Sequence, residues 1–398
     1  MEKGLKRFFF LICILLVTTA IFIFLFIKYS QIGYVKEHII VGSEDGAQTN
    51  YQIMLIIHYN SGLDSEENIY CDSRCKGDFG DVRFTDSSGN LLSYWIEEKT
   101  DFDRAKIWVK VPFIPAYPET TKIFFHYNNP SSSTTSNGGA TFVIFDDFED
   151  GIFNMALWEN ISMARGEVKE TNGVLRLTSP SGSSQNPETG TTAQIMSKVS
   201  YTGECSAHVR WRQALFSGRG GAVIVSLLDD ITVSPPWKGG YDLDWGSFTF
   251  APDVYNKFLI PERDKDGNIL QYTTWDLPFT EAQWLNFELK VLKDSAIVNA
   301  DGVERMLLQN TDDYTDNETL QLGLHVNSWA GQPQSRITEY DWVFLRKLCD
   351  PEPTHSETSL LQKPIDQSII VMLTLIIIGL IVGLYITIIF FLRKHLGN

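Results

Sequence analysis

The chain has 398 residues, of which 43% are hydrophobic and 13% aromatic, and its formal net charge is −16. This composition supplies enough apolar side chains for about two packed domains. The negative charge argues against nucleic acid as a partner, because it repels phosphate backbones, and it favours cations or a neutral, hydroxyl-rich ligand.

The first predicted element is an apolar run, Phe8–Ile27, that contains no charged residue. At ~1.5 Å per helical residue, it is long enough to cross a hydrocarbon core of ~30 Å. Basic residues precede the run, so we expect its N-terminal end to stay in the cytoplasm. They are Lys3, Lys6 and Arg7. No clear cleavage site follows, so we interpret residues 1–28 as an uncleaved transmembrane anchor and residues 29–48 as a neck.

A first β region is predicted over residues 49–130. Short apolar or alternating segments recur there between turn residues, a pattern typical of an antiparallel β-sandwich. The expected strands are Tyr51–Tyr59, Asp81–Thr85, Leu91–Glu97, Ala105–Val111 and Thr121–Tyr127.

Four motifs in this region carry a family resemblance. They are Asp78–Asp86 (DFGDVRFTD), Tyr94–Glu97 (YWIE), Ile107–Pro112 (IWVKVP) and Tyr127–Pro130 (YNNP). In this order they resemble domain of unknown function 2341, a module of archaeal and bacterial surface proteins. The resemblance implies a β-sandwich outside the cell with no established chemistry. Asn128 stands where the family usually has Gly, and Asn also tolerates a left-handed backbone conformation.

A polar segment over residues 131–140 (SSSTTSNGGA) predicts a linker between two domains. A second β region then covers residues 141–349. The expected strands are Thr141–Phe148, Val174–Leu177, Ser206–Gln213, Ala222–Leu228, Ser247–Phe250, Leu285–Val291, Ala296–Ala300, Leu320–His325 and Ile337–Arg346. Asp301-Gly302 predicts a hairpin turn, because this dipeptide tolerates positive φ.

The second region resembles concanavalin A-like and laminin-G-like jelly rolls. The matching segments are Phe145–Gly151 (FDDFEDG), Trp284–Leu289 (WLNFEL) and Tyr340–Val343 (YDWV). The resemblance implies two curved antiparallel sheets, and relatives include sugar-binding proteins and glycan hydrolases. The predicted fold class is therefore an all-β ectodomain of two antiparallel β-sandwiches, placed between two transmembrane helices.

The C-terminal part predicts a stalk, a second membrane helix and a short tail. Residues 350–368 are polar and contain proline, residues 369–392 are apolar and uncharged, and residues 393–398 include two basic residues. We therefore expect both termini in the cytoplasm and residues 29–368 outside the plasma membrane. Gly379 and Gly383 form a Gly-x-x-x-Gly pair that predicts a possible dimer contact.

The displayed part is more acidic than the whole chain. The first 28 residues carry a net charge of +3 and the residues from Ile369 onward carry +2, which leaves −21 for the part between them. Neither apolar run contains an ionisable residue, which disfavours a transport function.

Four cysteines fall in the displayed region, which predicts two disulfides in an oxidising compartment. They are Cys71, Cys75, Cys205 and Cys349. Three pairings are possible, and we favour Cys71–Cys75 with Cys205–Cys349 because each pair then stays within one domain. A zinc site is a weaker alternative, because no Cys-x-x-Cys pair completes a ligand set.

Aromatic residues in the second region are candidates for ligand binding, because flat rings stack on the apolar faces of sugars. The candidates are Trp237, Tyr241, Trp245 and Trp329, and Trp275 lies in a similar stretch. The alternative is that these large side chains fill the core.

Asp242 and Asp244 share one face of a predicted strand and are the only plausible pair of catalytic carboxylates. The usual Glu-x-Asp-x-x-Glu pattern of glycan hydrolases on this fold is absent. An exposed strand edge explains the two residues equally simply. We therefore name no catalytic residue beyond these two weak candidates.

Oxygen-rich segments predict a structural calcium ion. The candidate ligands are Asp146, Asp147, Glu149 and Asp150. Asp264–Asn268 (DKDGN) is also calcium-like, but turn chemistry explains it as well. Asn160 and Asn317 begin glycosylation sequons.

These observations predict a membrane-anchored cell-surface protein that binds a glycan or a protein partner through its jelly roll. Two alternatives stay open. The first is a tethered glycoside hydrolase that uses Asp242 or Asp244. The second is a structural subunit of the cell envelope without a ligand site.

Overall fold

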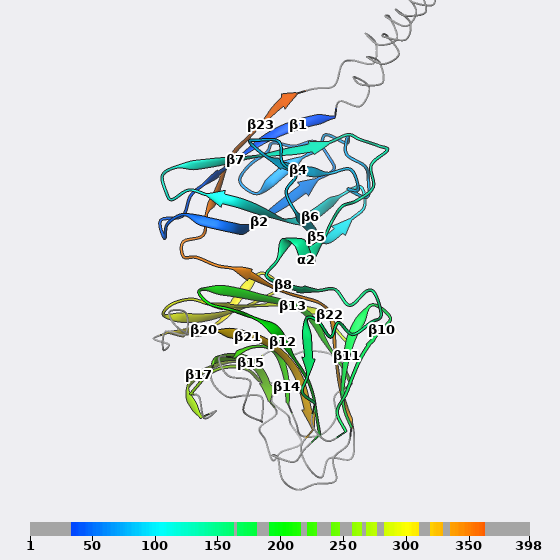
Figure 1. The fold of residues 1–398 in the computed structure, drawn as a ribbon, viewed down its shortest axis with the longest axis vertical. Helices are drawn as coiled ribbons and strands as arrows, with labels where there is room; N and C mark the ends of the chain where they lie inside the picture. Colours follow the sequence, from blue (N-terminus) through cyan, green and yellow to red (C-terminus); the bar gives the residue numbers. More distant parts are fainter. Residues whose placement is uncertain are drawn as a thin grey trace, which may run out of the picture.

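The computed structural model describes residues 33–162, 165–180, 191–215, 221–228, 240–246, 257–264, 268–276, 282–309, 319–328 and 335–362. These residues form two β-sandwiches stacked as four sheets (Figure 1), which confirms the all-β fold class. Within these ranges, no helix has the length and apolarity needed to cross a membrane. The two predicted spans, and with them Gly379 and Gly383, lie outside the described residues.

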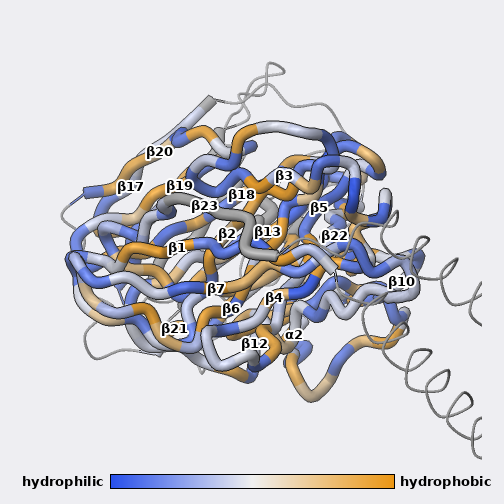
Figure 2. The backbone as a smooth tube through the Cα atoms, turned by 90° about the horizontal axis from the view of Figure 1, so that it is seen from above, coloured by the Kyte–Doolittle hydropathy of each residue, from blue (hydrophilic) through white to orange (hydrophobic). Residues whose placement is uncertain are grey.

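The first sandwich consists of two four-stranded sheets. One sheet contains, in order, β23 (Thr354–Gln362), β1 (Tyr34–Val41), β7 (Thr120–Tyr127) and β4 (Arg83–Asp86). The other contains β3 (Asn68–Tyr70), β2 (Gln48–His58), β6 (Arg104–Ile114) and β5 (Tyr94–Thr100). We call the first one the terminal sheet, because the described chain enters it at Gly33 and leaves it at Gln362. Hydrophilic and hydrophobic segments alternate along these strands (Figure 2), and the apolar rows form one core between the sheets.

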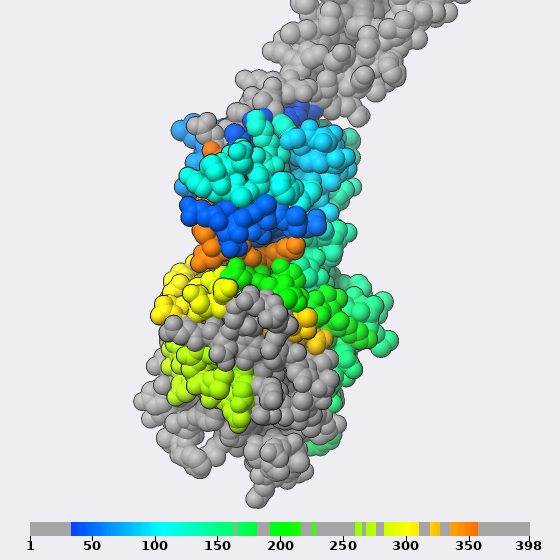
Figure 3. All heavy atoms as spheres, turned by 60° about the vertical axis from the view of Figure 1, so that its left-hand side comes forward, coloured from blue at the N-terminus to red at the C-terminus, as the bar shows by residue number. Residues whose placement is uncertain are grey.

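β1 and β23 correct the prediction of a neck over residues 29–48 and a stalk over residues 350–368. The two segments are neighbouring antiparallel strands, and Val35 pairs directly with Gln362. Figure 1 shows β1 and β23 side by side, and in Figure 3 the orange segment that leads to β23 lies against the blue band of the first sandwich. The first sandwich is therefore built from both ends of the described chain.

Two buried polar residues interrupt the apolar pattern of β1, so the sequence did not predict this segment as a core strand. Every second residue of β1 is buried, and two of these are Lys36 and His38. The ammonium group of Lys36 donates to Asp64 Oδ2 and to the Tyr70 carbonyl, each at 2.6 Å. His38 Nε2 lies 2.9 Å from Nδ1 of His355 on β23. These partners, all distant in sequence, compensate the cost of burying polar groups.

The second sandwich consists of an eight-stranded and a seven-stranded antiparallel sheet. The eight-stranded sheet contains β10 (Glu167–Thr171), β11 (Val174–Ser179), β22 (Arg336–Lys347), β13 (Cys205–Leu215), β18 (Leu285–Val291), β19 (Ser295–Ala300) and β20 (Val303–Gln309), and β8 (Ile144–Asp146) also pairs with β22. The seven-stranded sheet contains β17 (Ile269–Asp276), β16 (Lys257–Arg263), β15 (Gly240–Gly246), β14 (Gly221–Leu228), β21 (Leu320–Ser328), β12 (Thr191–Tyr201) and β9 (Trp158–Asn160). A large apolar core separates the two sheets. We call the seven-stranded sheet the distal sheet, because it lies at the opposite end of the stack from the terminal sheet (Figure 1). The expected strand Ser247–Phe250 lies outside the described residues.

An aromatic cluster joins the two sandwiches. It consists of Trp95, Trp108, Phe142, Trp342 and Phe344, all buried. The segment expected to be an open linker, residues 131–140, is packed at this junction. The Asn137 amide donates to the Tyr94 carbonyl at 2.8 Å, and the Asn137 side chain caps a short helix, α2 (Gly138–Thr141). Close packing of this kind favours a fixed arrangement of the two sandwiches.

Candidate functional site

The distal sheet carries a polar row on the face opposite its core. Gln194 on β12 and His325 on β21 pair directly, and their side chains are 1% and 2% exposed. Neither belongs to the apolar core between the sheets. Burial and the charge of Arg263 lower the pKa of His325 to about 3, so this side chain is neutral at physiological pH. Gln194 Nε2 has no hydrogen-bond partner among the described residues.

Backbone register places the candidate aspartates beside this polar row. Asp244 pairs with Val223 of β14, and Val223 pairs with His325. Asp242 pairs with Ser226, the next polar position along β14. The two aspartates therefore share the register of polar residues on neighbouring strands, in line with the two-residue period of a strand.

The aromatic candidates on β15, the strand that carries the two aspartates, are in register with core residues instead of the polar row. Tyr241 pairs with Leu227, which belongs to the core cluster. Trp245 pairs with Ala222, which in turn pairs with the core residue Val326. Trp275 is half-buried and packs against the same core. Trp237 and Trp329 lie outside the described residues.

The acidic segment after β8 makes hydrogen bonds within the protein. Asp146 Oδ2 accepts from Trp158 Nε1 at 2.7 Å, and Asp150 Oδ1 accepts from the Ile152 amide at 2.9 Å. In the part of the chain that the structure describes, no group of three or more His, Cys, Asp or Glu side chains is arranged to hold a metal ion. Calcium binding by Asp146, Asp147, Glu149 and Asp150 therefore stays a sequence-based prediction.

The second calcium-like segment forms a turn at its described ends. Both Asp264 carboxylate oxygens accept from Asn268, at 2.8 Å from its amide and 2.9 Å from its side chain. This geometry agrees with the turn interpretation. Asn160, the first sequon residue, is exposed on β9, and Asn317 lies outside the described residues.

Glu170 and Asp150 form a carboxyl pair at the end of the acidic segment after β8. This pair predicts that the stability of the protein depends on pH. Burial and a hydrogen bond with Asp150 raise the pKa of Glu170 to about 7. Glu170 thus binds its proton more tightly in the folded state, and this stabilisation is lost as the pH rises from about 4.5 through 7. Replacing Glu170 by Gln preserves the uncharged form, so we expect this variant to gain about 2 kcal/mol relative to wild type between about pH 5 and pH 8.

Denaturant unfolding of the full chain at the two pH values measures this difference. Glu167→Gln, an exposed position on the same strand, is the matched control. Equal pH dependence of Glu170→Gln and wild type would contradict the assignment.

All four displayed cysteines are buried and free in the structure. The Cys71 thiol forms a hydrogen bond with Cys75, so a Cys71–Cys75 disulfide stays a prediction that is consistent with their proximity. The reason given for pairing Cys205 with Cys349 was wrong. Cys205 lies in the core of the second sandwich, whereas the chain returns after β22 and places Cys349 in the core of the first.

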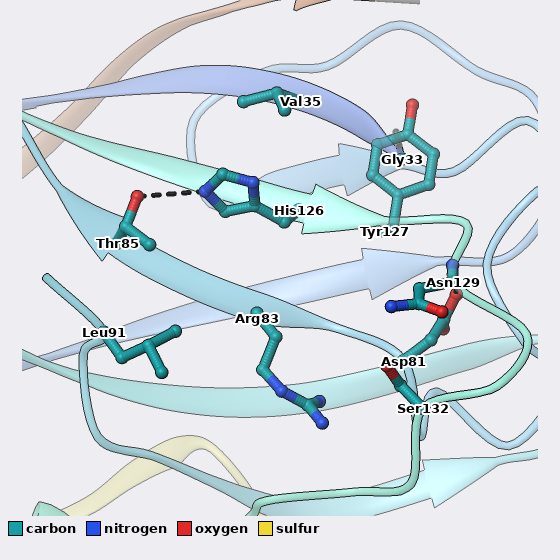
Figure 4. A pocket seen from close by; sticks show the side chains of 10 residues that line it. All are labelled: Gly33, Val35, Asp81, Arg83, Thr85, Leu91, His126, Tyr127, Asn129 and Ser132. Carbon is teal, nitrogen blue, oxygen red and sulfur yellow. Dashed lines mark hydrogen bonds between the residues drawn. The ribbon is translucent and has the colours of Figure 1, made fainter. Parts of the chain in front are cut away.

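A cavity of about 480 Å³ lies on the outer face of the terminal sheet (Figure 4). Its lining comes from β1, β4, β7 and the segments that follow β4 and β7. The lining residues are Gly33, Val35, Asp81, Arg83, Thr85, Leu91, His126, Tyr127, Asn129 and Ser132. Several belong to the sequence motifs of the first region, but the motifs alone gave no indication that the protein forms a cavity here.

Backbone groups hold the Arg83 side chain in this cavity. Nη1 donates to the carbonyls of Gly80 at 3.1 Å and Val82 at 2.6 Å, and Nη2 donates to the carbonyl of Ser133. Among the described residues Arg83 forms no ion pair, and its Nε makes no hydrogen bond. The guanidinium group is thus fixed in position while its charge is not neutralised by a carboxylate.

The other polar groups of the cavity are largely satisfied. Asp81 is 2% exposed, and its carboxylate accepts from the amides of Lys76, Asn128 and Asn129 at 2.8 to 3.0 Å. These three donors compensate the charge of Asp81 within the protein.

His126 is the one histidine among the described lining residues. Its Nε2 lies 2.9 Å from Thr85 Oγ1, and burial lowers its pKa, so it is uncharged near neutral pH. Arg83 is therefore the one cationic side chain in the described lining of the cavity.

Comparison with known proteins gives a family match for the first region. A family model, domain of unknown function (DUF2341), matches residues 78–161, which confirms the resemblance of the first region. No curated protein matches the chain.

Three solved structures illustrate what this chain is similar to. The catalytic domain of an endo-1,3-β-glucanase (laminarinase) from Thermotoga petrophila is 14% identical, with 52% of this chain and 97% of that chain covered and a TM-score of 0.39. LamAcat from Zobellia galactanivorans is 17% identical, with 53% and 100% covered and a TM-score of 0.40. A family GH16 protein of the Bacteroides ovatus mixed-linkage glucan system is 15% identical, with 51% and 99% covered and a TM-score of 0.39. At TM-scores below 0.5, nothing about the activity of this chain follows from these likenesses.

Proposed function

We propose that this chain is a membrane-anchored cell-surface protein that binds a neutral glycan through the distal sheet of its jelly roll. The pairing of Val35 with Gln362 carries this proposal. It brings the two ends of the displayed region together at one end of the stack, next to the two apolar runs of the sequence. The distal sheet then lies at the end of the stack farthest from the membrane.

Short connections support the membrane part of the proposal. Only residues 28–32 separate the first apolar run from Gly33, and only residues 363–368 separate Gln362 from the second run. Fully extended, each connection spans at most about 25 Å. The basic flanks place both outer ends of the runs in the cytoplasm, so the sandwiches between them belong outside.

The chemistry of the distal sheet supports a neutral, hydroxyl-rich ligand. Gln194 offers an unpaired amide donor, and neutral His325 lies beside it. Uncharged polar groups of this kind form hydrogen bonds with sugar hydroxyls. The charge of −21 on the displayed part disfavours strongly anionic partners.

A glycan array with the full chain in nonionic detergent tests the binding site. Replacing Gln194 by Leu removes the amide and also a buried unpaired donor, so we expect unchanged or higher stability with affinity reduced by about tenfold. Gln48→Leu, a half-buried position on β2, is the matched control. Full glycan binding by Gln194→Leu, or no glycan binding by wild type, would contradict the assignment.

Topology is tested separately by adding protease to intact cells and to inverted vesicles. We expect residues 33–362 to be digested only in intact cells. Digestion only in inverted vesicles would contradict surface display.

A tethered glycoside hydrolase is the second candidate, because Asp242 and Asp244 lie in register with polar residues of the distal sheet. Polysaccharide hydrolysis that Asp244→Asn abolishes would favour it. Absence of both binding and hydrolysis, with co-purification of envelope proteins, would favour a structural subunit.

A further inference from the structure

We propose that the cavity on the terminal sheet binds the phosphate group of a phospholipid headgroup through Arg83. This inference rests on the proposed membrane anchoring, because that anchoring supplies the ligand. It concerns a site at the opposite end of the molecule from the glycan-binding sheet.

Arg83 is held in place but has no carboxylate partner in the described part of the chain. Three carbonyl groups and the Tyr94 hydroxyl fix its guanidinium, and no carboxylate among the described residues pairs with it. Its Nε–H stays available beside Nη2, and this edge of a guanidinium matches two oxygens of a phosphate. A side chain that is already positioned loses little conformational entropy on binding.

The other ionisable side chains of the cavity leave Arg83 open to an anion. The Asp81 carboxylate is turned toward three backbone amides, and His126 is neutral, so Arg83 is the one cationic side chain among the described residues that line the cavity. On the same outer face, Lys122 is paired with Glu37 at 2.9 Å. The acidic remainder of the protein acts over longer distances, where salt screens it beyond about 10 Å.

The cavity lies where the chain enters the terminal sheet. Gly33 and Val35, where the chain enters the terminal sheet, line the cavity itself (Figure 4). Connections of at most about 25 Å hold this face near the headgroup layer when the apolar runs span the bilayer. Exposed Leu91 and half-buried Val35 add apolar wall that suits the glycerol and upper acyl part of a lipid.

Native mass spectrometry of the full chain in nonionic detergent tests the proposal. The probes are dihexanoylphosphatidylglycerol and dihexanoylglycerol, which differ in the phosphate headgroup. We expect binding of the first and at least about tenfold weaker binding of the second, because a charge-assisted hydrogen-bond pair is lost.

Matched leucine variants keep the test independent of folding. Leu91 is 73% exposed on the cavity wall, and Leu63 is 89% exposed and does not line the cavity. Leu91→Asp places a negative charge at the site and should weaken phosphatidylglycerol binding about tenfold, whereas Leu63→Asp should change it less than about twofold. Arg83→Lys keeps the charge but removes the planar fork, and it should also weaken binding.

Three results would overturn the proposal. They are equal binding of the two probes, equal effects of the two Asp variants, and displacement of the lipid by inorganic phosphate at matching concentration, which would assign the site to free phosphate. Lipid binding in detergent does not depend on topology in the cell. A negative lipid result beside a positive protease result therefore leaves the membrane proposal standing, and the reverse combination rejects the anchoring alone.

Discussion

Replacing Arg346 by Met is expected to lower the free energy of unfolding by about 3–5 kcal/mol, because it breaks a buried ion-pair network. Arg346, on β22, is 3% exposed at the junction of the two sandwiches. Its two terminal nitrogens bind the Glu352 carboxylate at 2.7 and 2.9 Å, and Nη2 also lies 3.4 Å from Glu288 Oε1. The guanidinium also lies 5.1 Å from the centre of the Trp108 ring. Without Arg346, the Glu352 and Glu288 carboxylates are left with the ammonium group of Lys290, at 3.5 and 3.8 Å.

The pKa of Glu352 reflects the same arrangement. Burial by itself would raise this pKa, but the charge of Arg346 outweighs burial and lowers it to about 2. The stabilisation that this carboxylate provides is present above pH 4.5 and is lost as the pH falls through about 2. At neutral pH the interaction is therefore fully formed, and the effect of Arg346→Met is measured there.

Denaturant unfolding followed by tryptophan fluorescence measures the loss. Arg305→Met is the matched control, because Arg305 is exposed on β20 and should change stability by less than about 0.5 kcal/mol. The double variant Arg346→Met/Glu352→Gln should recover part of the loss, since it removes one of the two negative charges. A loss below about 1 kcal/mol for Arg346→Met would show that the network contributes little to holding the sandwiches together.

Acidification below pH 6.5 is expected to destabilise the terminal sheet. His38 is fully buried, and burial together with neighbouring His355 lowers its pKa to about 3. In the unfolded chain the same side chain takes up a proton near pH 6.5, so stability is lost as the pH falls and the loss ends near pH 3. Between about pH 6.5 and pH 4.5, His38 alone should cost about 3 kcal/mol.

His38→Gln tests this prediction, because Gln keeps a hydrogen-bonding group beside His355 and does not titrate. Its stability should fall less steeply with acid than that of wild type, by about one proton. His58→Gln on β2, half-buried beside Asn68, is the control and should keep the wild-type slope. Parallel pH profiles of His38→Gln and wild type would contradict the role of this histidine pair.

Acid should destabilise β1 and β23 before it destabilises the second sandwich. His38 lies on β1 and His355 on β23, so protonation of either weakens the pair at the two ends of the displayed region. Hydrogen exchange should therefore show earlier loss of protection in these strands than in the second sandwich.

Alternation in the sequence located many of the strands. β7 and β18 each bury every second residue over most of their length, as their apolar pattern predicts. The Asp301-Gly302 turn has positive φ at both residues and joins β19 to β20. These elements depend on close neighbours in the chain, so a local pattern carries the information.

Residues at the junction and in the cavity were harder to assign from the sequence. Trp95 and Trp108 have the apolar character of sandwich core residues, yet they form the junction with the second sandwich. Arg83 was visible only as part of a motif, and its role in a cavity depends on carbonyl groups that three separate residues supply. Neither role has a local signal, because the neighbouring groups come from other segments.

The sequence by itself determined an acidic, all-β middle region with two predicted membrane runs and two sandwich modules. Only the tertiary structure decided that β1 and β23 close one sheet, through partners such as His38 and His355 that are 317 residues apart. Long-range pairing costs chain entropy that the buried sheet must offset, and no local pattern records which distant segment supplies the contact. That pairing brings both ends of the described chain to one sheet at one end of the stack.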